Sequence, residues 1–204
     1  MDKGATDMTI RKGLLDRRDI LSQLFPTPHD WLFVSGLAGA SKDAAKLTQD
    51  GGNLFSMAGT MGAAVPMGLG LALAAPQSQV AVVTGDGEML MGLGSLITVA
   101  SQSPANLAIL VIDNAMHGET GKQTGHTNSH ANLELLAKGS GLKHVMTIAE
   151  SHECEDARAF LHETQEGPRM LIARVLPTNP SSYKRNMDPN ACRHRFRDAF
   201  QDRV

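Results

Sequence analysis

Short runs of apolar residues recur along the chain, each bounded by glycine, proline or polar residues. In the runs Gln79–Thr84 (QVAVVT) and Asn106–Ile112 (NLAILVI), apolar side chains follow one another without a polar residue at every second position. A strand of this kind is buried on both faces, as in a parallel sheet. The pattern predicts buried strands over 31–34, 53–57, 79–84, 106–112, 144–147 and 170–175.

Segments with helical features alternate with these runs. Residues 8–25 place apolar side chains at helical spacing, and Pro26 ends the pattern. Ser41 is a suitable N-cap for a helix that ends near Leu47. A helix over 88–103 is expected despite its internal glycines. Further helices are predicted from about 63 onward and over 133–138, 151–165 and 190–200, whereas 113–130 is polar and shows no periodicity.

The alternation of strands and helices predicts the fold class: α/β, a three-layer doubly wound parallel sheet with helices on both faces. We find no internal repeat and no linker. Residues 1–204 are therefore expected to form a single domain, with 177–204 as a C-terminal extension. Ligands of such sheets bind at the carboxyl ends of the strands. Candidate chemistry is therefore sought in the loops after Val34, Met57, Thr84 and Ile112.

Composition narrows the class of protein. The chain has 204 residues, 42% of them hydrophobic, and a formal net charge of −2. This suits a globular domain and argues against a nucleic-acid partner held by positive charge. The longest apolar stretch, 63–75, is too short to cross a bilayer. Two cysteines, Cys154 and Cys192, cannot build a disulfide scaffold or an iron–sulfur cluster. We expect a cytoplasmic protein with no nucleic-acid and no membrane partner.

Two polar loops follow neighbouring predicted strands: residues 85–88 (GDGE) and residues 113–114 (DN). The glycines allow backbone N–H groups to approach an anion, and Asp86 and Asn114 supply hard oxygen ligands that suit magnesium. Taken alone, Asp-Gly is more often a hairpin turn, and Asn a turn residue. Because no alternating second strand follows Gly87, and because both loops end adjacent strands, we favour a metal-bridged diphosphate.

The motif GDG, followed by 26 residues and then Asn114, resembles the thiamine diphosphate fingerprint. The strings GTMGAAVPMGLGLALAAP and VVTGDGEMLMGLGSLITVASQSPANLAILVIDNAMHGETGKQTGHT resemble one family within that class. It comprises the thiamine-diphosphate-binding subunit of sulfopyruvate decarboxylase and the C-terminal half of phosphonopyruvate decarboxylase. The resemblance is dense over 53–130 and looser outside. It implies a diphosphate-half domain, with thiamine diphosphate and Mg²⁺ as cofactors.

The resemblance assigns roles to residues in the two polar loops. Asp86 and Asn114 correspond to the side-chain magnesium ligands, and the carbonyl of Met116 corresponds to the third protein ligand. The residues expected to contact the diphosphate through their backbone are Gly85, Gly87 and Glu88.

The string GTMG is the second part of the site that the resemblance implies. It places Gly59, Thr60 and Met61 at the cofactor. The carbonyl of Gly59 is expected to accept a hydrogen bond from the aminopyrimidine, and Met61 is expected to be the apolar wedge that bends the cofactor. The alternative interpretation of Met61 is a plain core methionine. Residues 35–36 (SG) are a weaker match that could touch the diphosphate.

The loop 116–130 carries the candidates for acid–base chemistry. His117 and Glu119 are candidate catalytic residues, since an imidazole titrates near neutrality and a carboxyl can also exchange protons. Lys122 could meet an anionic substrate. The family often has an aromatic residue near 117 and a small residue at 119, so this sequence departs from it there. The alternative for this loop is a mobile, solvated lid.

The resemblance also implies a missing part. In this enzyme class, a glutamate on a pyrimidine-binding domain makes the cofactor ionise. The residues of this chain are already taken up by the diphosphate-binding domain. We expect a separate pyrimidine-binding subunit that supplies the activating glutamate. The expected reaction is decarboxylation of a small anionic 2-oxo acid, sulfopyruvate or phosphonopyruvate. Two alternatives stay open: an acetolactate-synthase-like carboligase subunit and a non-catalytic, cofactor-binding regulatory subunit.

Overall fold

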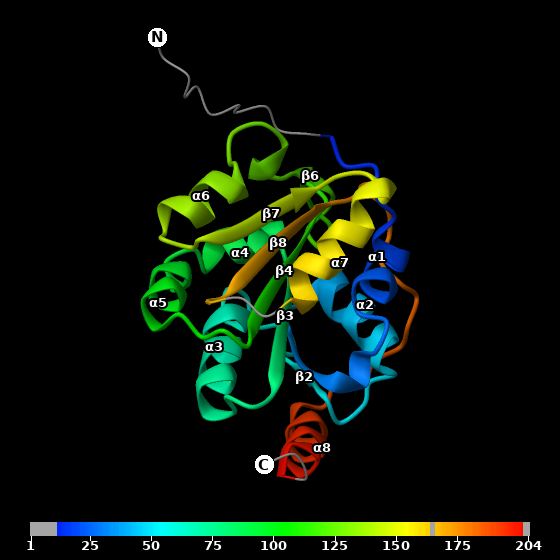
Figure 1. The fold of residues 1–204 in the computed structure, drawn as a ribbon. Coiled ribbons are helices and arrows are strands. Elements are labelled where there is room, and N and C mark those ends of the chain that lie inside the picture. Colours follow the sequence, from blue (N-terminus) through cyan, green and yellow to red (C-terminus); the bar gives the residue numbers. More distant parts are fainter. Residues whose placement is uncertain (1–11, 164–165, 202–204) are drawn as a thin grey trace.

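The computed structural model describes residues 12–163 and 166–201, and its centre is a six-stranded parallel sheet (Figure 1). The strand order is β2-β1-β3-β4-β8-β7, and all five neighbouring pairs are parallel. This confirms the predicted fold class. The strands are β1 (Trp31–Ser35), β2 (Leu54–Ser56), β3 (Gln79–Gly85), β4 (Leu107–Asp113), β7 (His144–Ile148) and β8 (Arg169–Arg174).

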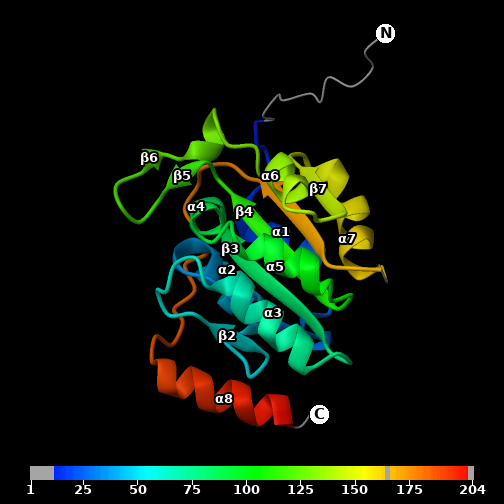
Figure 2. The same cartoon turned by 90° about the vertical axis from the view of Figure 1, so that its left-hand side faces the viewer.

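Helices cover both faces of the sheet, and each face has its own apolar core. Helices α1 (Arg17–Leu24), α2 (Ala38–Thr48) and α7 (Cys154–His162) pack on one face. The other face carries α3 (Ala64–Ala74), α4 (Asp86–Met91), α5 (Ser95–Gln102) and α6 (Leu133–Gly139). The last helix, α8 (Pro189–Gln201), lies beside the edge strand β2 (Figure 2).

The central strands divide their side chains between the two cores. In β3, Ala81 and Val83 belong to the core under α1 and α2, whereas Val80 and Val82 belong to the core under α3 and α5. All four side chains are at most 1% exposed. Because successive strand residues point to opposite faces, a strand covered on both sides must be apolar throughout. This explains the uninterrupted apolar runs in the sequence.

The order of the strands creates a switch point between β1 and β3. From β1 the chain crosses through α2 to the outer strand β2, and then returns through α3 on the opposite face to β3. The loops that leave β1 and β3 therefore diverge to opposite sides of the sheet. A crevice at the carboxyl ends of the strands follows from this divergence, and such crevices are where open α/β sheets bind ligands.

The first helix is shorter than the predicted 8–25. Helix α1 begins at Arg17, because the carboxylate of Asp16 caps it by accepting from the backbone N–H of Arg18 at 2.9 Å. Leu15 instead forms a parallel bridge with Val175. At Gly13 a Cβ would lie 2.4 Å from a backbone atom of Arg174, so the chain passes directly against β8 there. The part of the predicted helix before residue 12 lies outside the described residues.

The predicted cap at Ser41 is wrong. Helix α2 begins at Ala38, and Ser41 lies inside it, with its buried hydroxyl bonded to the hydroxyls of Ser35 and Ser56 at 3.2 and 2.9 Å. A serine in a helix can use its hydroxyl for tertiary contacts instead of capping. Here it ties the helix to the ends of β1 and β2.

The single helix predicted over 88–103 is also wrong, because the chain turns between α4 and α5. A Cβ at Gly92 would lie 2.4 Å from the carbonyl oxygen of Gly62. This close approach of two backbones needs glycine and moves α5 away from the axis of α4. Gly92 therefore marks a helix boundary.

Two further segments differ from their predictions. Within the polar region 113–130, β5 (Met116–His117) pairs antiparallel with β6 (Gln123–Thr124), and a 3₁₀ turn (His126–Asn128) follows. The helix expected over 151–165 is a 3₁₀ turn (Ser151–Glu153) followed by α7. Another 3₁₀ turn (Pro28–Asp30) precedes β1. Among the described residues, no helix combines the length and the apolar character needed to cross a membrane.

Candidate functional site

A cavity of about 520 Å³ lies at the carboxyl ends of the central strands. Most of its wall comes from the start of α2, the start of α4, the β5–β6 hairpin and the segment 178–182, and Arg17, Met61, Ile112 and Asn114 complete it. The predicted site residues that line it are Met61, Gly85, Asp86, Gly87, Glu88, Asn114, Met116, His117, Glu119 and Lys122. The fold therefore brings together two polar loops that are far apart in sequence.

Asp86 is a buried carboxylate at the start of α4. It is 4% exposed, and its Oδ2 accepts a hydrogen bond from the hydroxyl of Thr127 at 3.0 Å. Burial, and to a lesser degree the negative charge of Asp113, raise the pKa of Asp86 to about 6, against the opposing hydrogen bond from Thr127. A cation bound in the cavity would stabilise the charged form of this buried carboxylate.

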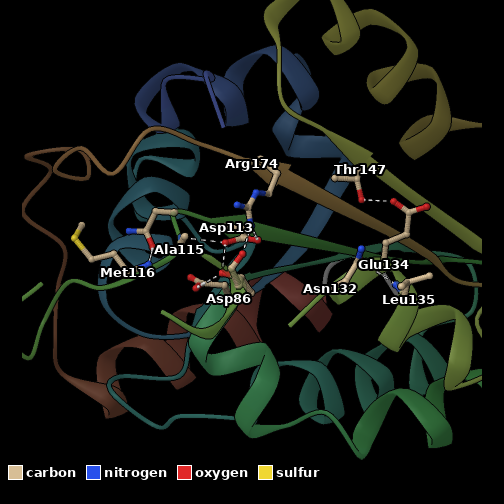
Figure 3. Close-up of polar contacts among 11 residues, drawn as sticks. Asp86, Asp113, Ala115, Met116, Asn132, Glu134, Leu135, Thr147 and Arg174 are labelled. Carbon is tan, nitrogen blue, oxygen red and sulfur yellow. Dashed lines mark hydrogen bonds and ion pairs between the residues drawn. The ribbon is translucent and has the colours of Figure 1, made fainter. Parts of the chain in front are cut away.

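Asp113, the last residue of β4, lies beneath Asp86 in a buried network. Its Oδ2 pairs with Arg174 Nη1 at 2.6 Å, and its Oδ1 accepts from the hydroxyl of Thr127 at 2.7 Å. Arg174 also donates to the carbonyl oxygen of Thr127 at 3.0 Å. In Figure 3 the side chain of Asp113 lies between those of Asp86 and Arg174. The guanidinium offsets one of two neighbouring negative charges, and the hydroxyl of Thr127 connects both carboxylates.

Asn114 and Met116 continue this wall after β4. The side-chain oxygen of Asn114 accepts from the backbone N–H of Met116 at 3.2 Å, and Ala115 between them has a left-handed φ of 55°. Gly125 closes the turn by donating its N–H to the carbonyl of Ala115 at 2.7 Å. A Cβ at Gly125 would lie 3.0 Å from Asp86 Oδ2. The turn is therefore packed directly against the carboxylate.

The oxygen donors at the ends of β3 and β4 are the carboxylate of Asp86, the side-chain amide of Asn114 and backbone carbonyls. No cluster of three or more His, Cys, Asp and Glu side chains that could hold a metal occurs within 12–163 and 166–201. Hard oxygen donors that leave positions for phosphate and water are of the kind that magnesium takes in proteins.

Glu88 has a structural role that the sequence did not suggest. Its side chain is buried, and its Oε2 accepts from the backbone N–H of Leu37 at 3.2 Å. At Gly36 a Cβ would lie 1.7 Å from the same oxygen, so only glycine leaves room for it. Burial raises the pKa of Glu88, while backbone N–H groups, that of Leu37 among them, oppose the rise. Glu88 thus ties α4 to the loop after β1.

Met61 lies at the cavity, and its side chain is 41% exposed. A Cβ at Gly87 would lie 3.8 Å from Met61 Cε, so the methionine borders the loop after β3. The alternative of a plain core methionine is therefore wrong. Gly59 and Thr60 are exposed in the preceding turn, where Gly59 has a φ of 102°, and they do not line the cavity.

The hairpin residues lie at the mouth of the cavity. His117 is half-buried against Gly87, where a Cβ would be 3.2 Å from its ring, and its ring meets that of His126 edge-on at 6.0 Å. Glu119 and Lys122 are exposed and line the cavity. The hairpin projects from this edge of the sheet (Figure 2). The chain here is a paired hairpin whose tip, residues 118–122, is exposed to solvent.

Several residues of the site were missed by sequence reasoning. Arg17, Lys42 and the segment 178–182 line the cavity, although they belong to a helix pattern and to a turn-rich connection. Thr127 donates a hydrogen bond to Asp86, and Arg174 forms an ion pair with Asp113. Their positions depend on tertiary packing, and no local spacing indicates them. The weakly matched residues 35–36 do not line the cavity; Ser35 is buried and bonded to Ser41.

Comparisons with known proteins show the family of the chain. Residues 38–173 match the family described as thiamine pyrophosphate enzyme, C-terminal TPP binding domain. The subunit beta of sulfopyruvate decarboxylase from Methanocaldococcus jannaschii is 36% identical over 171 residues, which are 83% of this chain and 88% of that protein. Phosphonopyruvate decarboxylase from Streptomyces viridochromogenes is also 36% identical over 171 residues, but these make up only 42% of its length.

A solved structure supports the fold. The thiamine diphosphate-dependent 4-hydroxybenzoylformate decarboxylase of Rhodococcus jostii RHA1 superposes with a TM-score of 0.65 at 19% identity, over 89% of this chain and 36% of that one. At this identity the likeness concerns the fold alone. The sequence matches show the family: the chain belongs to the thiamine pyrophosphate enzymes, as a C-terminal TPP-binding domain.

Proposed function

We propose that this chain is the diphosphate- and magnesium-binding subunit of a two-subunit, thiamine diphosphate-dependent decarboxylase. Its proposed substrate is a 2-oxo acid with a second anionic group, of the sulfopyruvate or phosphonopyruvate type. The observation that carries the proposal is the convergence of Asp86, Asn114 and Met116 on one cavity at the ends of β3 and β4. The names of the relatives supply the substrate class.

The residues present fit a magnesium-bridged diphosphate. Asp86 offers a buried carboxylate with no buried lysine or arginine bonded to it among the described residues, Asn114 offers an amide oxygen, and Met116 offers its carbonyl. At Gly85 and Gly118 a Cβ would meet no atom within 4 Å, so the backbone is open to the cavity. We propose that the backbone N–H groups of Gly85, Gly87 and Glu88 donate to phosphate oxygens once the cofactor is bound.

The remaining parts of the cavity suit the organic portion of the cofactor and the substrate. Met61 offers a flexible, exposed thioether against which a ring can pack. When bound, thiamine diphosphate supplies the electron sink for cleavage of the bond to the carboxylate. His117 can hold or release a proton at an imidazole nitrogen, and Lys122 places an ammonium group where an anionic acid enters. We propose that Gly59 and Thr60 contact the cofactor once a partner subunit packs against their turn.

An exposed apolar surface supports the proposal of a partner subunit. Helix α3 contains no polar side chain, and its outward residues Met67 and Leu73 are 37% and 48% exposed. Across the α4–α5 turn, Met91 and Ile97 are 66% and 63% exposed. Gly62 contacts Met91 and adjoins Met61, so this α3–α5 surface reaches the cavity. Helices α3 and α5 contact each other, and exposed apolar side chains on neighbouring helices are typical of protein–protein interfaces. The proposed occupant is the pyrimidine-binding subunit with its activating glutamate.

The test is reconstitution. The chain and a pyrimidine-binding partner are purified separately, mixed with thiamine diphosphate and Mg²⁺, and assayed with sulfopyruvate, phosphonopyruvate and pyruvate. We expect carbon dioxide and the corresponding aldehyde from a dianionic acid only when both chains are present. A product that joins two substrate molecules would instead indicate a carboligase. Turnover by this chain alone, shown free of other proteins by mass spectrometry, would contradict the two-subunit proposal.

A further inference from the structure

Thr127 is a buried residue in a 3₁₀ turn whose other residues are exposed. It is 0% exposed, whereas His126 and Asn128 on either side of it are open to solvent. Its hydroxyl donates to Asp86 Oδ2 at 3.0 Å and to Asp113 Oδ1 at 2.7 Å. A hydroxyl carries one hydrogen, so the two carboxylates share this donor. A polar group is buried at low cost only where it is hydrogen-bonded, and here both partners are carboxylates.

The backbone around Thr127 is held in place by further hydrogen bonds. The carbonyl oxygen of Thr127 accepts from Arg174 Nη1 at 3.0 Å, and the same nitrogen pairs with Asp113 Oδ2 at 2.6 Å. Two residues earlier, the N–H of Gly125 donates to the carbonyl oxygen of Ala115 at 2.7 Å. These contacts fix the position of Thr127 independently of the carboxylate at the cavity. The hydroxyl is therefore a preorganised donor.

The charges in this network are arranged so that Asp86 keeps its own. The guanidinium of Arg174 pairs with Asp113, and both side chains are buried, as Figure 3 shows. Within 12–163 and 166–201, Asp86 forms no ion pair. An ammonium or guanidinium group bonded to Asp86 would compete with a bound cation, whereas a hydroxyl orients the carboxylate and adds no charge. A neutral donor therefore suits a carboxylate that must bind a metal ion.

We propose that Thr127 is a positioning residue: its hydroxyl holds the carboxylate of Asp86 in the orientation that binds a divalent cation. Thr127 does not line the cavity, so it acts through Asp86 and not on a ligand directly. Asp113 and Arg174 in turn hold Thr127. This inference rests on the proposed function and adds to it a residue 41 positions from Asp86 in the sequence.

The experiment compares variants of the full chain in the reconstituted complex with the pyrimidine-binding partner. Thr127→Val removes the hydroxyl and keeps a similar shape, whereas Thr127→Ser keeps the hydroxyl. The matched control is Thr124→Val, the same change at an exposed hairpin position outside the cavity wall. Equilibrium dialysis of thiamine diphosphate at increasing Mg²⁺ gives the Mg²⁺ concentration for half-maximal binding. Calorimetry in EDTA gives the melting temperature of each metal-free variant.

We expect Thr127→Val to raise the Mg²⁺ concentration for half-maximal binding about tenfold, the loss expected when a ligating carboxylate loses its outer hydrogen bond. At saturating Mg²⁺ it should bind as much thiamine diphosphate per chain as wild type. Thr127→Ser and Thr124→Val should both keep the wild-type Mg²⁺ dependence. A merely structural role would instead lower the melting temperature and the amount of cofactor bound, without shifting the Mg²⁺ dependence.

Three results would overturn the inference. They are a wild-type Mg²⁺ dependence in Thr127→Val, the structural pattern just described, and a shift in Thr127→Ser as large as in Thr127→Val. If Thr127→Val does not fold, Thr127→Cys decides, because a thiol is only a weak donor and should also require more Mg²⁺ than Thr127→Ser. Failure of wild type to bind thiamine diphosphate at any Mg²⁺ concentration would count against the proposed function itself. Normal wild-type binding with an unshifted Thr127→Val would count against the role of Thr127 alone.

Discussion

Asp86 combines two demands on a single residue: it must stay charged to bind a cation, and the fold buries it. Burial and the nearby Asp113 raise its pKa to about 6 in the metal-free protein. A carboxyl with a raised pKa in the folded state binds its proton more tightly folded than unfolded. Its ionisation therefore destabilises the fold above pH 6, and this cost disappears as the pH falls toward 4. A bound magnesium ion would offset the same cost.

The Asp86→Asn variant tests this balance. Without metal, the variant should be more stable than wild type at pH 7, because it lacks the buried charge. The advantage should shrink by about 1 kcal/mol between pH 7 and pH 5, as Asp86 takes up its proton. Urea unfolding in EDTA at both pH values measures it. A difference that is independent of pH would show that Asp86 does not titrate in this range.

Met61 allows a second test at this scale. Because its side chain is 41% exposed, Met61→Ala should change the melting temperature of the metal-free chain by only a few degrees. Turnover of the reconstituted enzyme should fall on the order of a hundredfold, since a bound ring loses its support and reacting groups are misplaced. Met61→Leu conserves volume and should keep most activity. A sharp loss of stability with unchanged turnover would remove Met61 from the site.

At the scale of elements, the turn between α4 and α5 sets the direction of the chain after the GDG loop. Gly92→Ala places a Cβ 2.4 Å from the carbonyl oxygen of Gly62, a backbone atom that cannot move aside easily. We expect a loss of about 1–3 kcal/mol, as for overpacked interior positions. Gly94→Ala is the matched control, because a Cβ there meets nothing within 4 Å and its φ is negative. Equal stability of the two variants would contradict this account of the turn.

The same turn marks the limit of what the sequence could predict. Runs such as 79–84 and 106–112 identified the central strands, because a strand covered on both faces must be apolar at every position. The break at Gly92 could not be predicted, because its cause is a contact with Gly62, thirty residues earlier. Ser41 was misjudged for the same reason, since its partners are on β1 and β2.

The sequence could predict some residues of the candidate site but not others. The loops 85–88 and 113–114 could be predicted, since both follow strands and carry glycine or oxygen donors at fixed spacing. Thr127 and Arg174 could not, because they reach Asp86 and Asp113 only through the fold. The segment 178–182 carries only turn-forming residues in sequence, and it becomes part of the site through Asp43.

At the scale of the whole molecule, the α3–α5 surface is the feature that a partner subunit would explain. Ile97→Lys places a charge on its exposed part and should weaken association at least tenfold, while the chain remains folded. Arg158→Glu on α7, which covers the opposite face of the sheet, is the control and should associate as wild type. Analytical ultracentrifugation of the mixed subunits measures both. Normal association of Ile97→Lys would place the partner on another surface.

The central claim is that Asp86 and Asn114 hold a magnesium-bridged thiamine diphosphate. The most direct measurement is calorimetric titration of thiamine diphosphate into the reconstituted complex, with Mg²⁺ and with EDTA, for wild type, Asp86→Ala and Asn114→Ala. We predict that wild type binds only with Mg²⁺. Asp86→Ala should lose the magnesium-dependent binding, and Asn114→Ala should weaken it less, because it removes a neutral ligand. Wild-type affinity in Asp86→Ala, with the same dependence on Mg²⁺, would contradict the claim.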